Sequence, residues 1–521
     1  MSSIPAFGRF CLRTARRVLR LLCWITLQVA VVLIAAFLLY NKVEGSKWES
    51  YRKDAAARGI LLDLPKDHAA PIPDRDNFAA AAGPFAPKSA ASQQDWLPDF
   101  QGLPLHFPSL THGTRMTIAQ AYAEGATPAK ASDAAPRPEL NESKAAEDFL
   151  ALCDQRFGGQ WPAILEVEAR PKSQVTPAAT ILPRPRSFSP LMARKVAQVH
   201  EMRAMAFFDL HRDDEAFDEV EGILRIVRGV QAADRKNLTT HMIATAILGL
   251  GLTPIWEGLV DRHWSEGQLA TLEKELAAFH PVDRWTETMD SERQWENAVY
   301  DRLVTASFAE RVRNFQDIFK AEFLVEQSAE KTLGPARMFA LITCSTGVIR
   351  HNQLYSNQSW DLARQWISAD GQWHPELIST FLAFGNLNRA ERTEYAIAAL
   401  LATAAQRALC RVIVIEAQAR QARLGIALER YRRQHGDLPE KLDALAPEFI
   451  EAIPIDPINN APIRYTRETN ASFTLRCPDH GPYGEMKIGD VFDGDKVNGK
   501  TDIVWHGLEP ESRREFNTAA P

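Results

Sequence analysis

The sequence predicts a mainly α-helical membrane protein with one N-terminal transmembrane helix, a body of α-helical hairpins, and a small C-terminal α+β head. Three observations lead to this prediction. Twenty uncharged residues, 21–40, form an apolar run near the N-terminus. From about 143 to 431, apolar residues recur at three- and four-residue steps, the period of an amphipathic helix. After Gly436, short apolar runs alternate with turn residues, which is typical of strands.

The apolar run is long enough to anchor the chain in a lipid bilayer. At about 1.5 Å per residue, a helix over 21–40 spans roughly the 30 Å of the hydrocarbon core. Residues 1–20 form a basic tail with five arginines and no acid: Arg9, Arg13, Arg16, Arg17 and Arg20. Because positive residues stay in the cytoplasm, we expect a single-pass protein of the inner membrane with its bulk in the periplasm. A cleaved signal peptide is the rival interpretation, but its apolar region covers only ~7–15 residues.

The part of the chain beyond the anchor is acidic. The net charge is −6, and the first 40 residues contribute five positive charges, so the remainder carries −6 − 5 = −11. Such a charge argues against nucleic acid as a partner, because phosphate backbones bind basic surfaces. Four cysteines would face an oxidising compartment, and their spacing selects none of the three full disulfide pairings. They are Cys153, Cys344, Cys410 and Cys477.

Beyond the anchor, the chain divides into four further segments. A stalk and an irregular proline-rich segment with a linker occupy 41–142, a helical body 143–388, a long helix with the head 389–510, and a tail 511–521. In the stalk we expect a short helix over 48–58, before prolines become too dense for long regular elements. In the body, a helix over 191–210 and a helix whose apolar face runs from Phe217 to Val227 form a hairpin, joined by a polar turn at 211–214. Further helices are predicted over 237–260, 265–279, 283–305 and 310–345.

The C-terminal head carries the most specific motifs. Strands are predicted over 463–466, 472–475 and 503–505, after a long helix over 389–431. Motif residues follow in order: Ala427-Leu428, Tyr431-Arg432, His435-Gly436, Leu438-Pro439, Asp456-Pro457, Pro462, Tyr465, Asp479, Gly481, Asp502-Ile503 and Trp505. Over about 425–506 this pattern resembles the globular head of the major pseudopilin of type II secretion systems. The resemblance implies a protein-binding head related to pilus-like machinery.

The N-terminal region departs from that family. No acid occurs before Glu44, and nearly 400 residues separate the anchor from the head, so polymerisation as a pilus subunit is not expected. Trp48, Gly59, Pro73-Asp74 and the stretch 77–79 give a second resemblance. The chain is similar to uncharacterised, large bacterial single-pass membrane proteins that end in the same kind of head. That likeness implies no chemistry.

An acidic loop in the head suggests a metal site. The pseudopilin resemblance implies calcium in the loop before the final strand, where Asp479, Asp493, Asp495 and Asp502 lie. Calcium prefers six to eight oxygen ligands, which carboxylates spaced along a loop can supply. The loop lacks the final glutamate of an EF-hand, so a solvated acidic turn remains the alternative interpretation. No other cofactor is expected.

A second group of acids lies near tryptophans at 285–296. Paired carboxylates beside aromatic residues are typical of sugar hydrolases. Helical spacing instead predicts that Glu287, Asp290, Glu292 and Glu296 share a solvated face, with Trp285 and Trp295 in the core. No catalytic motif is found, and we expect a structural or protein-binding component of the cell envelope rather than an enzyme. A membrane-tethered hydrolase with carboxylates from distant helices is the alternative hypothesis.

Overall fold

The fold is that of a computed structural model of the 521-residue chain. It describes residues 6–65, 72–80, 142–174, 190–232, 238–307, 345–368, 405–458, 460–478 and 502–507, with a few single positions between 310 and 398. The described residues are mainly helical and include a small antiparallel sheet, as the sequence predicts. They group into two compact units, each described separately below.

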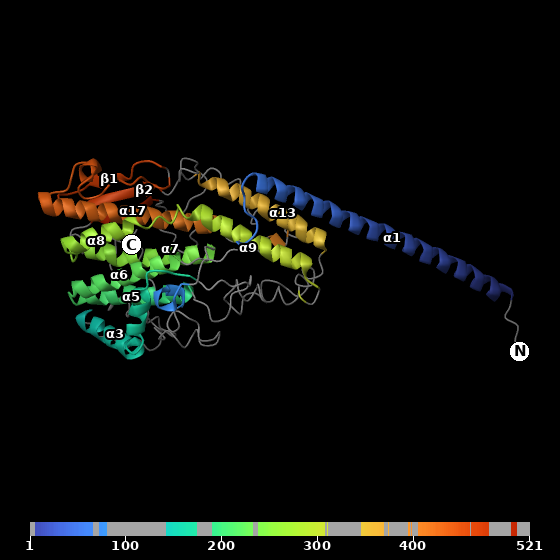
Figure 1. The fold of residues 1–521 in the computed structure, drawn as a ribbon, viewed down its shortest axis with the longest axis horizontal. Helices are drawn as coiled ribbons and strands as arrows, with labels where there is room; N and C mark the ends of the chain where they lie inside the picture. The colour runs from blue at the N-terminus through green and yellow to red at the C-terminus, as the bar shows by residue number, and fades with distance from the viewer. Residues whose placement is uncertain are drawn as a thin grey trace, which may run out of the picture. The chain divides into compact units, whose positions relative to one another are not determined.

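Unit 1 comprises residues 1–64, 294–359 and 384–402. It contains α1 (Ala6–Ala57), most of α9 (Trp285–Thr305) and most of α13 (Thr346–Ala363). Helix α1 runs without interruption for 52 residues (Figure 1). The predicted short helix over 48–58 is therefore not separate: the stalk continues the helix that contains the apolar run.

Helix α1 is long and apolar enough to span a membrane. None of the most apolar window of Leu19–Ala57 is buried, and its large apolar side chains are exposed. A second helix, α7 (Leu238–Val260), passes the same test of length and hydropathy, but 72% of its apolar window is buried. Burial within unit 2 explains the apolar character of α7, whereas among the described residues the apolar window of α1 is not buried.

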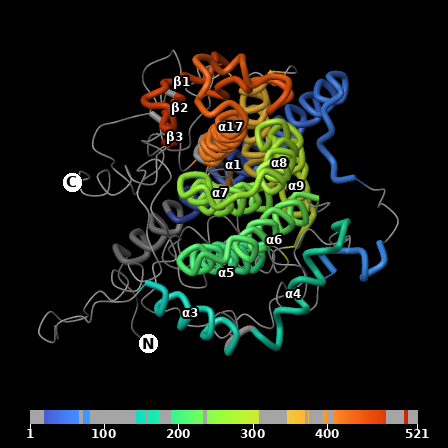
Figure 2. The backbone as a smooth tube through the Cα atoms, turned by 90° about the vertical axis from the view of Figure 1, so that its left-hand side faces the viewer, coloured from blue at the N-terminus to red at the C-terminus, as the bar shows by residue number. Residues whose placement is uncertain are grey.

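Unit 2 comprises residues 65–293, 360–383 and 403–521. Its remaining helices are α3 (Glu142–Phe157), α4 (Trp161–Glu168), α5 (Pro190–Asp209), α6 (Asp213–Gln231), α8 (Glu266–Ala277) and α17 (Ala405–His435). Short 3-10 turns are η1 (Asp74–Asp76), η2 (Phe78–Ala80), η5 (Arg364–Trp366) and η7 (Leu442–Leu445). Figure 2 shows α7 between the α5–α6 hairpin and α17.

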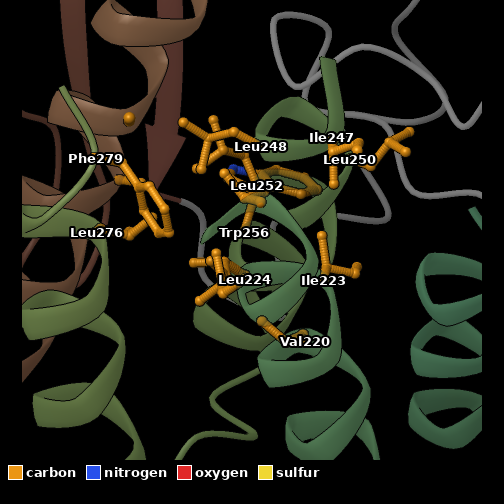
Figure 3. Packing of buried hydrophobic residues seen from close by; sticks show 14 of the residues in the cluster. Val220, Ile223, Leu224, Ile247, Leu248, Leu250, Leu252, Trp256, Leu276 and Phe279 are labelled. Carbon is orange, nitrogen blue, oxygen red and sulfur yellow. The ribbon is translucent and has the colours of Figure 1, made fainter. Parts of the chain in front are cut away.

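The predicted hairpin of α5 and α6 is confirmed, and its apolar face builds the core. Ile223 and Leu224 of α6 point toward α7, where Ile247, Leu248 and Trp256 lie (Figure 3). All five side chains are at most 2% exposed. Since full burial of such a side chain stabilises a fold by about 1.5–3 kcal/mol, these contacts fix α6 against α7.

The predicted C-terminal strands are confirmed as one three-stranded antiparallel sheet in the order β1-β2-β3. The strands are β1 (Arg464–Arg467), β2 (Phe473–Pro478) and β3 (Asp502–Gly507). The sheet is bonded to α17, because the Gln421 amide donates hydrogen bonds to the carbonyl oxygens of Leu475 (3.2 Å) and Ile503 (2.9 Å).

Helix α17 also packs on α7 and α8, so it belongs to the core of the helical body as much as to the head. The indole of Trp256 on α7 donates a hydrogen bond to the carbonyl oxygen of His506 on β3, at 2.8 Å. One apolar cluster includes residues of both the body helices and the sheet. The head is therefore part of unit 2 and not a separate domain of its own.

Candidate functional site

The predicted calcium ligands lie almost entirely outside the described residues. Asp479, Asp493 and Asp495 are not described, and of Asp502 only the backbone is described, at the start of β3 opposite Pro478. Within the described ranges, no group of three His, Cys, Asp or Glu side chains is arranged to hold a metal ion. The calcium site stays a prediction, and so does the 310–345 helix, of which only isolated positions are described.

The acids near the tryptophans differ from their predicted placement. Glu287 is exposed and Trp285 is buried, as expected, but the prediction that Glu292 and Glu296 are solvated is wrong. Each is at most 4% exposed. Glu292 accepts a hydrogen bond from the backbone N–H of Leu238, the first residue of α7, at 3.1 Å. Such a carboxylate satisfies a free N–H and faces the positive end of the helix dipole.

Glu296 has a different partner, in unit 1, where its carboxylate accepts a hydrogen bond from the Ser356 hydroxyl. The three glutamates of the hydrolase hypothesis thus do not share one environment. Glu287 faces solvent, while Glu292 and Glu296 are engaged in separate structural bonds. Nothing in this geometry adds support to the hydrolase alternative.

A buried charge cluster in unit 2 links three helices. His200 of α5 lies with Nδ1 2.6 Å from Glu219 of α6 and Nε2 2.8 Å from Glu168 of α4. Arg203 donates to the other oxygen of Glu219 at 2.7 Å. His200 is 1% exposed, and a Cβ on Gly222 would lie 2.7 Å from its ring, so only glycine fits there.

The two glutamates set the charge of His200. Burial by itself lowers the pKa of the imidazole, but the charges and hydrogen bonds of Glu168 and Glu219 outweigh it and raise the pKa to about 9. Both ring nitrogens then donate, so His200 is an imidazolium at neutral pH. A cation that is closed to solvent and donates both protons to carboxylates is not free to act as a base. The cluster therefore fastens α4, α5 and α6 together.

The next residue, Glu201, is buried without a strong cation. Burial raises its pKa to about 8, although a hydrogen bond with Thr253 and the charge of Arg194 act in the opposite direction. Glu201 is thus a neutral acid at pH 7, on the helix that carries the His200 imidazolium. Both His200 and Glu201 are therefore buried residues of the helical core.

The second half of α1 contacts α13 in unit 1 (Figure 1). The Asn41 side-chain oxygen accepts a hydrogen bond from the backbone N–H of Gly347 at 2.7 Å. One turn further along α1, Glu44 lies 3.1 Å from His351 Nδ1. The Tyr51 hydroxyl then donates to the carbonyl oxygen of Asn357, at 3.3 Å. We call this set of contacts the α1–α13 clamp.

Gly347 permits the close approach in this clamp. A Cβ at this position would lie 2.6 Å from Asn41 Oδ1 and 2.9 Å from the Asn41 Cα atom. Trp48 is 2% exposed between the polar pairs and belongs to a small apolar cluster with Ala55 and Leu62. Since Asn41 directly follows the apolar run, the clamp begins at the first residue beyond the predicted span.

Helix α13 also packs against α9 through buried amides. Asn297 Oδ1 accepts hydrogen bonds from Gln353 at 3.0 Å and from Asn357 at 2.7 Å. All three side chains are at most 2% exposed. Buried amides that satisfy one another specify a single helix register, because any shift leaves polar groups unpaired.

The structure excludes one of the possible disulfide pairs. Cys153 and Cys477 are buried free thiols, so they do not pair with each other. Burial raises the pKa of the Cys153 thiol to about 12, which keeps it protonated and unreactive. The side chains of Cys344 and Cys410 lie outside the described residues.

Comparisons with protein-family models, with curated proteins and with solved structures gave no match. The resemblance to pseudopilin heads therefore rests on the motif residues of the sequence alone. The structure leaves two features for a functional argument: the α1–α13 clamp and the sheet of unit 2.

Sequence reasoning missed both the buried charge cluster and the clamp. Their residues lie far apart in the sequence: Glu168, His200 and Glu219 in one case, Asn41 and Gly347 in the other. One signal was present, because Glu44 is the first acid of the chain and lies four residues after the apolar run. Glu44 is also 4% exposed, and a buried carboxylate needs a partner, which His351 supplies.

Proposed function

We propose that the chain is a single-pass membrane protein whose N-terminus lies in the cytoplasm, and that its extracytoplasmic part binds a protein partner in the cell envelope. The observation that carries this proposal is the uninterrupted α1. None of its apolar window is buried, and the helix continues without a break into the clamp that bonds it to α13.

The continuity of α1 gives the anchor a mechanical role. A flexible linker after the span would leave the extracytoplasmic part free to rotate on the membrane. Here Asn41, Glu44 and Tyr51 bond to α13 over nearly three turns beyond the span, with Glu44 one turn and Tyr51 about three turns after Asn41. We infer that unit 1 is held in one orientation on its membrane helix, which suits a scaffold for other envelope components.

The sheet of unit 2 is the surface we propose for the partner. Strand β1 pairs only with β2 among the described residues, and Arg464 and Thr466 are exposed on it. A short edge strand with exposed side chains can accept a partner segment. The resemblance of this region to pseudopilin heads, which assemble with other proteins, favours the same surface. Type II secretion or pilus-like machinery is the partner class that this resemblance suggests.

A photo-crosslinking amino acid at Thr466 of the full-length protein in intact cells tests the proposal. We expect a discrete adduct with one envelope protein. The same amino acid at Lys144, an exposed residue of α3 in the same unit, should give none. Equal adducts at both positions, or none at either, would count against β1 as a partner surface. Adding Arg464→Glu to the protein that carries the crosslinking amino acid at position 466 should reduce the adduct if the contact is specific.

A further inference from the structure

The apolar part of α1 contains two polar side chains in its middle, and only one of them is satisfied. The Thr26 hydroxyl donates to the carbonyl oxygen of Leu22 at 2.7 Å, within its own helix. Gln28 is exposed, and no described residue hydrogen-bonds its amide. At about 1.5 Å per residue, Gln28 lies roughly 10 Å beyond Leu21, inside the hydrocarbon core.

An unpaired amide at that depth is costly because lipid offers no hydrogen bond. Transfer of an amide to an apolar medium without a partner costs on the order of several kcal/mol. A glutamine side chain is too short to reach water from this depth and lacks the compact geometry that lets threonine bond its own helix. Another transmembrane helix is the remaining source of a partner.

We propose that two copies of this chain associate in the membrane through the Gln28 face of α1, with the two amides hydrogen-bonded to each other. This inference rests on the proposed transmembrane role of α1. A primary amide is both donor and acceptor, so in two-fold symmetry each Gln28 amide can donate one hydrogen bond to the other and accept one from it. The residues nearest to Gln28 around the helix axis are apolar and exposed: Leu21, Trp24, Val32 and Leu39.

The clamp leaves this face open to a second copy. A helix turns by about 100° per residue, so Glu44, sixteen residues after Gln28, lies within about 20° of the side of α1 opposite to Gln28. Trp48 likewise lies about 20° from the opposite side. Helix α13 therefore attaches to the back of α1 relative to Gln28. A pair of helices in contact through Gln28 would carry the two copies of α13 on the outside, without collision.

Two alanines of α1 provide a matched test. Ala35 lies about 20° from Gln28 around the axis, and Ala30 lies about 160° away. In a full-length background without Cys11 and Cys23, Ala35→Cys should form a disulfide-linked product of twice the mass on mild oxidation of native membranes. Ala30→Cys should not. The parent background, which retains its other cysteines, corrects for crosslinks formed elsewhere.

The amide itself is tested in the Ala35→Cys background. Gln28→Leu should lower the yield of the linked product roughly three- to tenfold, the range expected for one interhelical hydrogen bond between transmembrane helices. Gln28→Asn should retain most of it. Thr26→Val is the control for the loss of any polar side chain from the apolar run. It should leave the yield of the linked product unchanged, because the Thr26 hydroxyl is already hydrogen-bonded within α1.

Three results would overturn the inference. Equal yields from Ala30→Cys and Ala35→Cys would show no preferred face, and an unchanged yield in Gln28→Leu would remove the amide from the contact. An Ala35→Cys product of a different mass would identify another membrane protein as the occupant. Alkaline carbonate extraction of the membranes tests the membrane span separately from the dimer. Release of the protein would refute the membrane span as well, whereas retention without the linked product would refute the dimer alone.

Discussion

At the scale of single residues, the most consequential side chains are buried charges. His200 is held by two glutamates, and its pKa is raised from 6.5 to about 9. Because the folded pKa is the higher one, the cluster contributes its full stability below pH 6.5. That contribution is lost as the pH rises through 9. The protein should therefore become less stable on the alkaline side of neutrality.

His200→Gln tests this pH dependence. At pH 6.5 the variant should be less stable by about 2–4 kcal/mol, because two buried carboxylates lose their cation. The difference from the unaltered protein should shrink toward pH 9.5, where His200 itself becomes neutral. Thermal melting of the detergent-solubilised full chain across this range measures both effects. A difference that stays constant with pH would show that His200 is not charged in the fold.

Glu201 should respond in the opposite way to substitution. Its pKa is raised from 4.5 to about 8, so keeping the buried acid protonated costs stability as the pH rises from 4.5 through 8. Glu201→Gln removes that cost and retains an amide for Thr253. We expect the variant to be more stable at pH 7.5 by about 1–3 kcal/mol, with no advantage at pH 4.5. The same melting series provides the measurement, and destabilisation at pH 7.5 would contradict the prediction.

Residue burial is also where sequence reasoning was least informative. Helical spacing placed Glu287, Glu292 and Glu296 on one solvated face, yet only Glu287 is exposed. Spacing identifies which residues share a side of a helix, but not whether a polar side chain meets solvent or a buried partner. The partners here are the N–H of Leu238 and the Ser356 hydroxyl, which are 54 and 60 residues away. No local pattern could predict them.

At the scale of elements, regular structure was largely predictable. The period of apolar residues predicted α5, α7, α8 and α9 close to their observed bounds and the central part of α6, and the turn residues predicted the three strands. No bounds were predicted for α3, α4 or α13. The sequence predicted a short separate helix over 48–58. In the structure this helix continues from the apolar run, and Asn41, Glu44 and Trp48 contact α13.

Gly347 is the element-scale test of the clamp. Gly347→Ala would place a Cβ 2.6 Å from Asn41 Oδ1 and 2.9 Å from its Cα atom, so α1 and α13 must separate. We expect faster amide hydrogen exchange over residues 41–57 in the full-length protein. Gly45→Ala is the matched control, because a Cβ at that helical position of α1 meets nothing within 4 Å.

The control should leave exchange unchanged or slower, since alanine favours a helix over glycine by roughly 0.5–1 kcal/mol. If both variants behave alike, the close approach at Gly347 does not hold the two helices together. If Gly347→Ala alone exchanges faster, the clamp is a real connection between the predicted span and α13.

At the scale of the whole molecule, the helical class and the small sheet followed from the sequence, but the grouping of elements did not. Sequence order suggested a body followed by a separate head. In the structure, α17 packs on α7 and α8 as well as on the sheet. Gln421 and Trp256 bond the strands from two different helices. Contacts between α7 and α17 join segments more than 140 residues apart, which periodicity cannot reveal.

The orientation of the chain in the membrane is the prediction that belongs to this scale. An alkaline phosphatase reporter after Pro521 should be active, because the five arginines before the span keep the N-terminus in the cytoplasm. A reporter that works only in the cytoplasm should be inactive at the same site. Changing Arg13, Arg16, Arg17 and Arg20 to alanine leaves Lys42 and later basic residues beyond the span, so the orientation should become mixed. Cytoplasmic activity of the unaltered fusion would place the bulk of the chain inside the cell and remove the basis for an envelope partner.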